Sequence, residues 1–270
     1  MYGSKVNYET HFFISGDQAT TPDARELSGI DTLDIGYQNS AGVTNPLGYQ
    51  NGVTTIGGPT SQTVSFSRYL IYNDPILSFT GDVPIEASFN YQNNTSYGFA
   101  SGYLTSYSVN CAVGSVPKVS TNLVVYDEMR SGYNVSGTGA TDIYIPNQGS
   151  ITATCDNTTT NRVIGFDYSL TSTRKPYYTI GMEGPAEVKH IPPIQYTASV
   201  QLEVDSAFME SGYSFLGTGK NSRTVTFGIN GRDGTSLQSL SVPNACLVSE
   251  QMNISAEGAL RLTLNYMGHQ

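Results

Sequence analysis

The chain has 270 residues, of which 38% are hydrophobic and only 13% charged, with 28 Gly, 19 Tyr and no Trp. A chain of this length can bury its own core as one large domain or two smaller ones, so stability does not require disulfides. The net charge of −9, from 13 basic and 22 acidic residues, argues against a protein that grips the phosphate backbone of nucleic acid.

The first 58 residues carry few strand signals. Residues 28–60 are rich in Gly, Asn, Thr and Pro, as in Asn45-Pro46 and Gly57-Gly58-Pro59. A segment with so few apolar residues either orders against a partner or forms plain surface loops. We therefore predict an N-terminal arm and long loop region at residues 1–58, and both interpretations of it stay open.

Strand-type alternation dominates from residue 62 onward, and no helical apolar period is sustained beyond two turns. Short helices are predicted only at Asp127–Arg130 and Asp205–Glu210, each of which follows a strand and ends at Ser-Gly. A tight hairpin tip is predicted at Asn230–Gly234, because Asn-Gly and Asp-Gly accept positive φ angles. The predicted strands are 63–72, 84–91, 102–112, 119–126, 142–145, 151–155, 163–170, 196–204, 223–229, 246–255 and 260–266.

Two segments about eighty residues apart, 117–139 and 193–219, share four features in the same order: a Pro, an alternating strand, Ser-Gly-Tyr and Gly-Thr-Gly. This self-similarity predicts a duplicated β unit, with a first β lobe at 59–165 and a second β lobe at 166–270. The predicted fold class is all-β, with duplicated antiparallel β-sandwich or barrel units, long loops and at most short helices. Two similar lobes can occupy quasi-equivalent positions in one ring. Three chains would then form a pseudo-sixfold annulus.

No catalytic, cofactor-binding or metal-binding residue is predicted, and no enzymatic activity is expected. The loop Gly217–Lys220 departs from a phosphate-binding loop, which needs Gly in place of Ser214 and Ser or Thr in place of Asn221. There is no G-x-S-x-G motif. A carboxylate pair for glycoside cleavage stays open, because spatial separation alone defines such a pair. The histidines lack a second ligand at metal-binding spacing: His11, His190 and His269.

The three cysteines, Cys111, Cys155 and Cys246, are an odd number without a C-x-x-C spacing, which favours neither a disulfide framework nor a zinc site. We predict that they are small buried hydrophobes in a reducing compartment. The sequence lacks an apolar stretch of signal-peptide or membrane-span length, so synthesis and assembly in a cytoplasm are expected. The Asn-x-Ser/Thr sequons receive no function, since they are expected by chance in such a composition: Asn94, Asn134, Asn157 and Asn253.

From Gly165 to Gly268 the chain resembles the body of bacteriophage tail-tube proteins, which are structural proteins of the virion. The residues that carry this resemblance are Phe166–Leu170, Arg174–Tyr178, Pro192–Gln195 with the following alternating strand, Thr224–Thr235, and a final hairpin of Val242–Leu247 and Ala259–Tyr266. Earlier residues have similar features, from Ser28-Gly29-Ile30 to Ser67-Arg68 and Asp74-Pro75.

The resemblance implies subunits that self-assemble into rings, a trimer with pseudo-sixfold symmetry or a hexamer, which stack into a tube for genome delivery. Acidic and polar residues would line the lumen, and DNA would pass through it without sequence-specific binding. An arm or long loop would bridge the rings. The implied partners are other copies and other tail proteins: tape measure, neck, baseplate and, as a further candidate, a sheath. The implied location is the virion tail, assembled in the host cytoplasm, with no cofactor, metal or membrane segment.

Two alternatives remain. The chain could be a carbohydrate- or receptor-binding β-sandwich that uses some of its 19 tyrosines as stacking platforms, or a neck or tail-end adaptor protein. A binding module predicts clustered exposed aromatic side chains and a stable monomer. A tube protein predicts rings or tubes that form in a concentration-dependent way.

Overall fold

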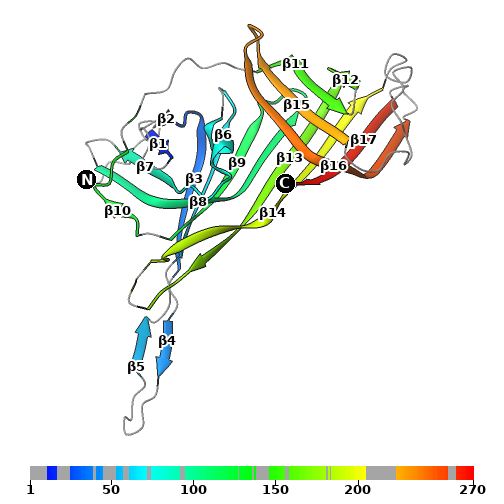
Figure 1. Cartoon of the computed structure of the whole chain (residues 1–270). Coiled ribbons are helices and arrows are strands. Elements are labelled where there is room, and N and C mark those ends of the chain that lie inside the picture. The colour runs from blue at the N-terminus through cyan, green and yellow to red at the C-terminus, as the bar shows by residue number, and fades with distance from the viewer. Residues whose placement is uncertain are drawn as a thin grey trace.

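The computed structural model is built almost entirely of antiparallel β-strands (Figure 1). It describes residues 11–16, 25–38, 41–44, 53–56, 61–71, 74–91, 95–126, 128–135, 137, 146–155, 158–180, 182, 184–204, 223–254 and 260–270. These residues include no α-helix, and a short 3-10 helix, η2, spans Pro75–Phe79. The all-β prediction is confirmed.

The strands of the first part of the chain are β1 (His11–Ser15), β2 (Arg25–Glu26), β3 (Ile30–Gln38), β4 (Ala41–Thr44), β5 (Val53–Ile56), β6 (Ser61–Tyr69), β7 (Ile85–Tyr91), β8 (Thr95–Ala112), β9 (Lys118–Val125) and β10 (Arg130–Ser131). Those of the second part are β11 (Pro146–Cys155), β12 (Thr158–Thr160), β13 (Val163–Tyr177), β14 (Glu187–Glu203), β15 (Arg223–Gly231), β16 (Ser236–Ile254) and β17 (Leu260–His269).

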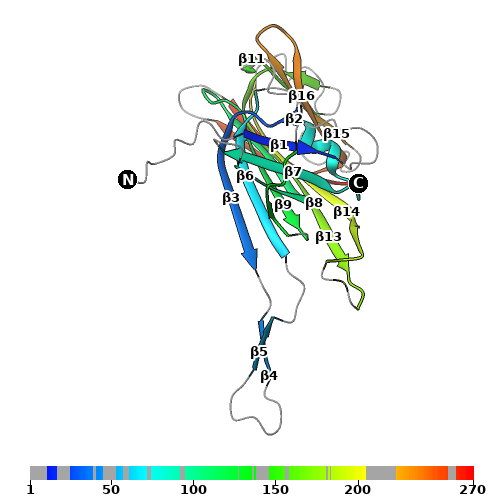
Figure 2. The same ribbon diagram turned by 90° about the vertical axis from the view of Figure 1, so that its left-hand side faces the viewer.

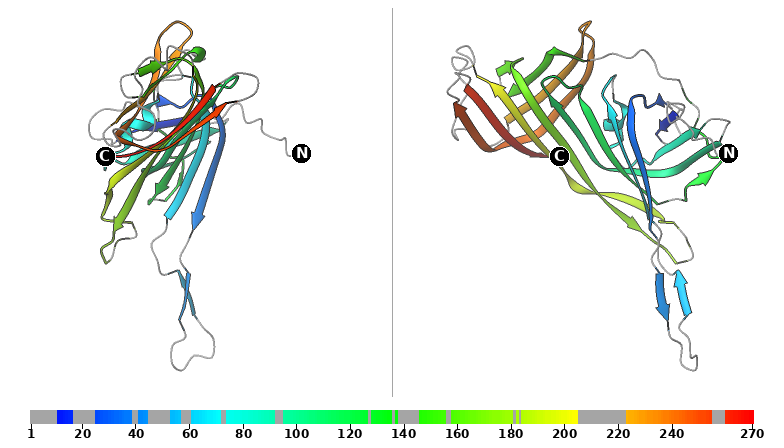
Figure 3. Two further views of the ribbon diagram at one scale, coloured as in Figure 1. Left: turned by 90° about the vertical axis from the view of Figure 1, so that its right-hand side faces the viewer. Right: turned by 180° about the vertical axis from the view of Figure 1, so that it is seen from behind.

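The order in which strands pair is the same in the two parts of the chain. In the first part it is β2-β1-β7-β8-β9-β6-β3, and in the second it is β12-β11-β15-β16-β17-β14-β13. The central strand of each series, β8 or β16, is long and curved (Figure 3). Its first half pairs with β7 or β15, and its second half pairs with β9 or β17.

The core lies between the two sheets that this central strand joins. In the first part the rings of Phe12 on β1 and Phe66 on β6 lie 5.2 Å apart. In the second part the rings of Phe166 on β13 and Phe227 on β15 stack at 4.7 Å. Side chains alternate between this core and solvent along each strand, as a sheet with one buried face requires. Each part therefore packs sheet against sheet.

Two hairpins extend away from these packed sheets. The far ends of β13 and β14 form a two-stranded ribbon in which Arg174 pairs with His190. Strands β4 and β5 form a separate small sheet that lies beyond the ends of β3 and β6 (Figure 2). Both extensions leave the same end of the molecule.

Several predicted elements can be compared with the structure. The hairpin tip at Asn230–Gly234 is confirmed, since Gly231 N donates to Thr235 O at 2.8 Å and Gly234 has a φ of +84°. The predicted helix at Asp127–Arg130 is wrong where it is described, because residues 128–129 have no regular structure and Arg130 begins β10. Strand 142–145 and helix Asp205–Glu210 lie outside the described residues.

The range 1–58, predicted as an arm and long loop, contains strands of the main sheet. Phe12, Ile14 and Leu27 are buried in the core, and β1 pairs with β7 along its whole length. The predicted lobe boundary at 165/166 stays a prediction, although β11 and β12 precede it and β11 pairs with β15. The eighty-residue similarity aligns β9 with β14, and these strands hold different places in the strand order.

Candidate functional site

One continuous eight-stranded sheet crosses both parts of the chain, in the order β3-β6-β9-β8-β13-β14-β17-β16. The two parts meet where β13 pairs with the second half of β8, from Thr171 opposite Ser106 to Gly165 opposite Ala112. We call this pairing the internal junction. It makes the sheet continuous, and the two outermost strands of that sheet are β3 and the second half of β16.

The face of this sheet that points away from the core consists mainly of small uncharged polar side chains. Such side chains on neighbouring strands bond to each other: Ser169 and Thr197 lie 2.6 Å apart, and Asn122 Nδ2 donates to Ser106 Oγ at 2.7 Å. We call this surface the polar face. Its Ser, Thr, Asn and Gln residues are Thr63, Ser65, Ser106, Ser108, Asn110, Ser120, Asn122, Ser169, Thr171, Thr197, Ser199, Gln201, Ser249, Gln251, Asn253, Thr263 and Asn265.

Charged pairs lie at one end of the polar face, where the loops between its strands gather. Lys118 Nζ bonds to Asp31 Oδ2 at 2.6 Å, and this hydrogen bond raises the pKa of the lysine. Arg162 lies 3.9 Å from Glu203 at the same end. In the middle of the face Asp167 accepts a hydrogen bond from Asn110. The face can therefore form many weak hydrogen bonds, and its described residues place no row of cations along it.

One outer edge of the sheet is β3. This strand pairs with β6 on one side, and no strand of the described chain pairs with its other side. Its side chains Ile35 and Tyr37 are exposed although they stand on the core-facing side of the strand. An unpaired strand edge with exposed apolar side chains is a ready template for pairing with another chain.

The other outer edge is the second half of β16. It pairs with β17 on one side, whereas β15 ends its pairing on the opposite side at Ala245. Beyond that residue the opposite side of β16 has no partner strand within the described ranges. Val248, Met252 and Ile254 are exposed here. Two unlike free edges, one at each end of a single sheet, are thus the candidate site.

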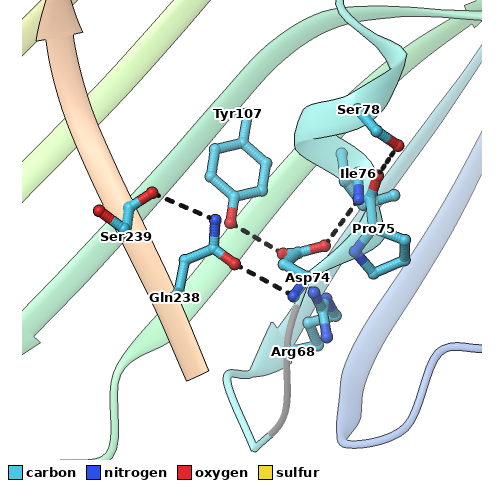
Figure 4. Close-up of polar contacts among 8 residues, drawn as sticks. All are labelled: Arg68, Asp74, Pro75, Ile76, Ser78, Tyr107, Gln238 and Ser239. Atoms are coloured by element: carbon cyan, nitrogen blue, oxygen red, sulfur yellow. Dashed lines mark hydrogen bonds and ion pairs between the residues drawn. The ribbon is translucent and has the colours of Figure 1, made fainter. Parts of the chain in front are cut away.

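A buried ionic cluster ties the two parts of the chain together near the internal junction (Figure 4). Arg68 forms an ion pair with Asp74, and both side chains are fully buried. Tyr107 Oη donates to Asp74 Oδ2 at 2.8 Å, and Asp74 N donates to Gln238 Oε1 on β16 at 3.1 Å. Burial, followed by the nearby Asp74 charge, raises the pKa of Tyr107, so this phenol stays neutral.

This cluster lacks the solvent access that a catalytic site needs. Arg68, Asp74 and Tyr107 are each at most 5% exposed, and they bond to one another or to the backbone. Asp74 Oδ1 also accepts from Ile76 N at 2.9 Å, which caps η2. The arrangement can hold η2 against both parts of the chain, and we assign it a structural role.

The structure does not bring the sequence-level candidates together. His190 N donates to Asp82 at 2.7 Å, His269 lies exposed at the end of β17, and the side chain of His11 is outside the described residues. The loop Gly217–Lys220 also lies outside them. No group of three His, Cys, Asp or Glu that could hold a metal occurs in the described part of the chain, and the helix-type membrane spans searched for there are absent too.

The cysteines and sequons can be placed in part. Cys111 and Cys155 are buried free thiols as predicted, Cys246 is half-buried, and burial raises the pKa of Cys111 to about 11. Asn134 is exposed and accepts from Asn90, while Asn253 lies on the free edge of β16. Asn94 and Asn157 lie outside the described residues.

Sequence reasoning identified neither the free edges nor the polar face. The polar face does leave a signal, because Ser106, Ser108 and Asn110 alternate with apolar residues along one strand. The edges leave none, since pairing partners lie far apart in the sequence. No protein-family model matches the chain, and no curated protein matches it either. The function is therefore inferred from the two free edges and the polar face.

Proposed function

We propose that this chain is a structural protein that assembles with copies of itself into rings, which stack to form the tube of a phage tail. The observation that carries this proposal is a single eight-stranded sheet with an unpaired edge at each end and an uncharged polar face between them. The resemblance to tail-tube proteins described above agrees with it.

Assembly follows from the difference between the two edges. A contact between β3 of one copy and β16 of the next leaves the same two edges free at the ends of the pair. Such a head-to-tail contact makes a ring if the rotation between copies closes. Closure turns the sheets of all copies into one barrel and removes every free edge, together with the aggregation hazard that an exposed edge carries.

The polar face would line the inside of the tube. Its hydroxyl and amide groups bond to water and to one another, as Asn265 does to Ser249 at 2.7 Å. Tight DNA binding needs many Lys or Arg contacts to phosphates, and the chain carries a net charge of −9. A surface of this kind lets DNA pass through without holding it.

The remaining parts of the proposal concern partners. The two parts of the chain share a strand order, which suits a trimer with pseudo-sixfold symmetry; a hexamer is the other candidate. The β4–β5 hairpin projects beyond the sheet (Figure 2) and is suited to reach a neighbouring ring. Tape-measure, neck and baseplate proteins would contact the tube in the virion, after assembly in the host cytoplasm.

Size-exclusion chromatography with light scattering, followed by negative-stain microscopy, tests this function. We expect annular or tubular particles whose mass is a whole multiple of the 29.0 kDa chain and whose fraction rises with protein concentration. A monodisperse monomer at high concentration, with no rings on the grid, would overturn the proposal.

A further inference from the structure

We propose that neighbouring copies join in the register of the internal junction, so that β3 of one copy pairs antiparallel with residues 249–254 of β16 in the next copy and places Asp34 opposite Asn253. This inference rests on the proposed self-assembly and specifies its contact. It follows from a structural correspondence between the two parts of the chain.

Strands β8 and β16 correspond residue by residue. The register of β8 with β9 shifts between Leu104 and Ser106, and that of β16 with β17 shifts between Leu247 and Ser249. Asn122 Nδ2 donates to Ser106 Oγ at 2.7 Å just after the first shift. Asn265 donates to Ser249 in the same way, also at 2.7 Å. Both serines and both asparagines are therefore 143 residues apart, from 106 to 249 and from 122 to 265.

The free edge of β16 is the same edge that β13 occupies on β8. Gly102 pairs with both β7 and β9, and Ser106 pairs with both β9 and β13, so β7 and β13 share one edge of β8. Strand β7 ends its pairing at Gly102, and β15 ends its pairing at the corresponding Ala245. Beyond Ala245, β16 offers a second copy the edge that β13 fills on β8.

Strands β3 and β13 also correspond. Leu33 pairs with Phe66, which pairs with Thr121 on β9. Phe166 pairs with Val200, which pairs with Leu264 on β17. Because Thr121 and Leu264 are again 143 residues apart, from 121 to 264, Leu33 corresponds to Phe166. Asp34 then corresponds to Asp167.

The internal junction supplies the register for the external one. Within the chain, Asp167 stands opposite Asn110 and accepts a hydrogen bond from its amide. The corresponding residues on the free edges are again an aspartate and an asparagine, Asp34 and Asn253. Transferring the internal pairs 166–111, 168–109 and 170–107 gives the external pairs Leu33 with Ile254, Ile35 with Met252 and Tyr37 with Glu250.

The exposure of corresponding apolar side chains shows which contact is still missing. Tyr168 and Leu170 of the internal junction are 3% and 2% exposed, whereas Ile35 and Tyr37 are 40% and 58% exposed. Across the junction, the residues facing them behave alike. Val109 and Cys111 are 1% and 5% exposed, but Met252 and Ile254 are 44% and 74% exposed. Pairing with a second copy in this register would give these four side chains the environment that their counterparts already have.

Disulfide trapping tests the register. Opposed residues of antiparallel strands have Cβ atoms about 4.5–5.5 Å apart and diagonal ones about 7–8 Å apart, and a disulfide needs about 3.5–4.5 Å. In a Cys246→Ser background, chains carrying Asp34→Cys are mixed with chains carrying Asn253→Cys and oxidised mildly. We expect covalent dimers from the mixture and none from either variant alone, because a head-to-tail contact never brings two copies of one edge together.

Two controls make the result specific. The double variant Asn110→Cys/Asp167→Cys should form the corresponding disulfide within one chain, which shows that this geometry supports the bond. The offset mixture of Asp34→Cys with Gln251→Cys should give roughly tenfold less dimer, because its Cβ atoms would be diagonal. Rings that form normally but crosslink best in the offset mixture, or not at all, would overturn the register and leave the proposed function standing. Absence of rings for the Cys246→Ser chain would instead overturn the function.

A charge exchange tests the same pair without cysteines. Asn253→Asp places two carboxylates opposite each other and should raise the dissociation constant of the contact about fivefold, as expected for facing like charges. Adding Asp34→Asn to that variant restores an Asp–Asn pair with the roles exchanged and should restore assembly. Equal assembly by all three proteins would contradict the proposed pairing.

Discussion

The internal junction and the two free edges have corresponding strands but differ in what covers them. At the junction, β13 and β8 bury Tyr168 and Val109 against the core. At the edges, Ile35 and Met252 hold the corresponding positions and remain exposed. The difference indicates that exposure at these positions depends on whether the neighbouring strand is present, since the residue types are apolar in both places.

A second difference lies in the composition of the two contacts. Tyr107, which is buried at the junction and bonded to Asp74, corresponds to Glu250 on the free edge of β16. A junction that closes during folding can be wholly apolar and ionic inside. An edge that stays exposed until another copy arrives needs a charge that limits indiscriminate pairing. The comparison therefore separates residues that fold the chain from residues that we propose join the copies.

The largest expected effect comes from one substitution made at two corresponding sites. Val109→Lys should prevent folding, because it buries an unpaired charge at a position that is 1% exposed. Met252→Lys should leave the monomer folded and abolish rings, because Met252 is exposed until a second copy covers it. Circular dichroism and light scattering on both variants check this. Rings formed by Met252→Lys at the wild-type concentration would refute the contact.

The buried ionic cluster provides the next test, because the second part of the chain has no copy of it. Leu202 corresponds to Arg68, as each is opposite a 143-residue-related partner, Val119 or Leu262. Asp74→Ala leaves Arg68 charged and buried, and should lower the free energy of unfolding by about 3–5 kcal/mol. Urea denaturation measures this change. A loss below about 1 kcal/mol would mean that the ion pair does not hold the two parts together.

A smaller effect tests the correspondence itself. Asn122→Ala and Asn265→Ala each remove one side-chain hydrogen bond to a serine, at 2.7 Å in both places. Each should cost about 0.5–1.5 kcal/mol in the monomer, and the two losses should agree within about 0.5 kcal/mol. Urea unfolding curves of the two variants supply the comparison. Clearly unequal losses would show that the two positions are not equivalent.

The smallest expected effect concerns alkaline pH. Burial raises the pKa of Cys111 from 9.0 to about 11, so the folded state holds this proton more tightly than the unfolded state does. The corresponding stability is fully present below pH 9 and declines between pH 9 and pH 11. Urea midpoints measured across this window should fall less steeply for Cys111→Ala than for the wild type. Identical slopes would show that the thiol is not protected in the fold.

The sequence predicted strands best where alternation and turn residues act locally. The runs at 163–170 and 223–229 and the tip at Asn230–Gly234 agree with β13, β15 and their turn. Strand β3 was missed because its residues are mostly polar and exposed, as suits an outer edge. A strand of this kind has little amphipathic signal until a partner covers it.

Long-range features were beyond sequence reasoning for a different reason. The eighty-residue similarity was built on Ser-Gly-Tyr and Gly-Thr-Gly, which are turn residues common in a chain with 28 Gly. The 143-residue correspondence is visible only through strand registers and the bonds of Asn122 and Asn265. Likewise, Asp74 meets Gln238 across 164 positions, and no local pattern announces such a contact.

A map of the assembled particle at a resolution that traces the chain tests the central claim most directly. We predict that β3 of each copy is hydrogen-bonded to residues 249–254 of the next, with Asp34 opposite Asn253 and the polar face turned toward the lumen. A particle in which these two edges stay uncovered, or in which copies meet through other surfaces, would contradict the account.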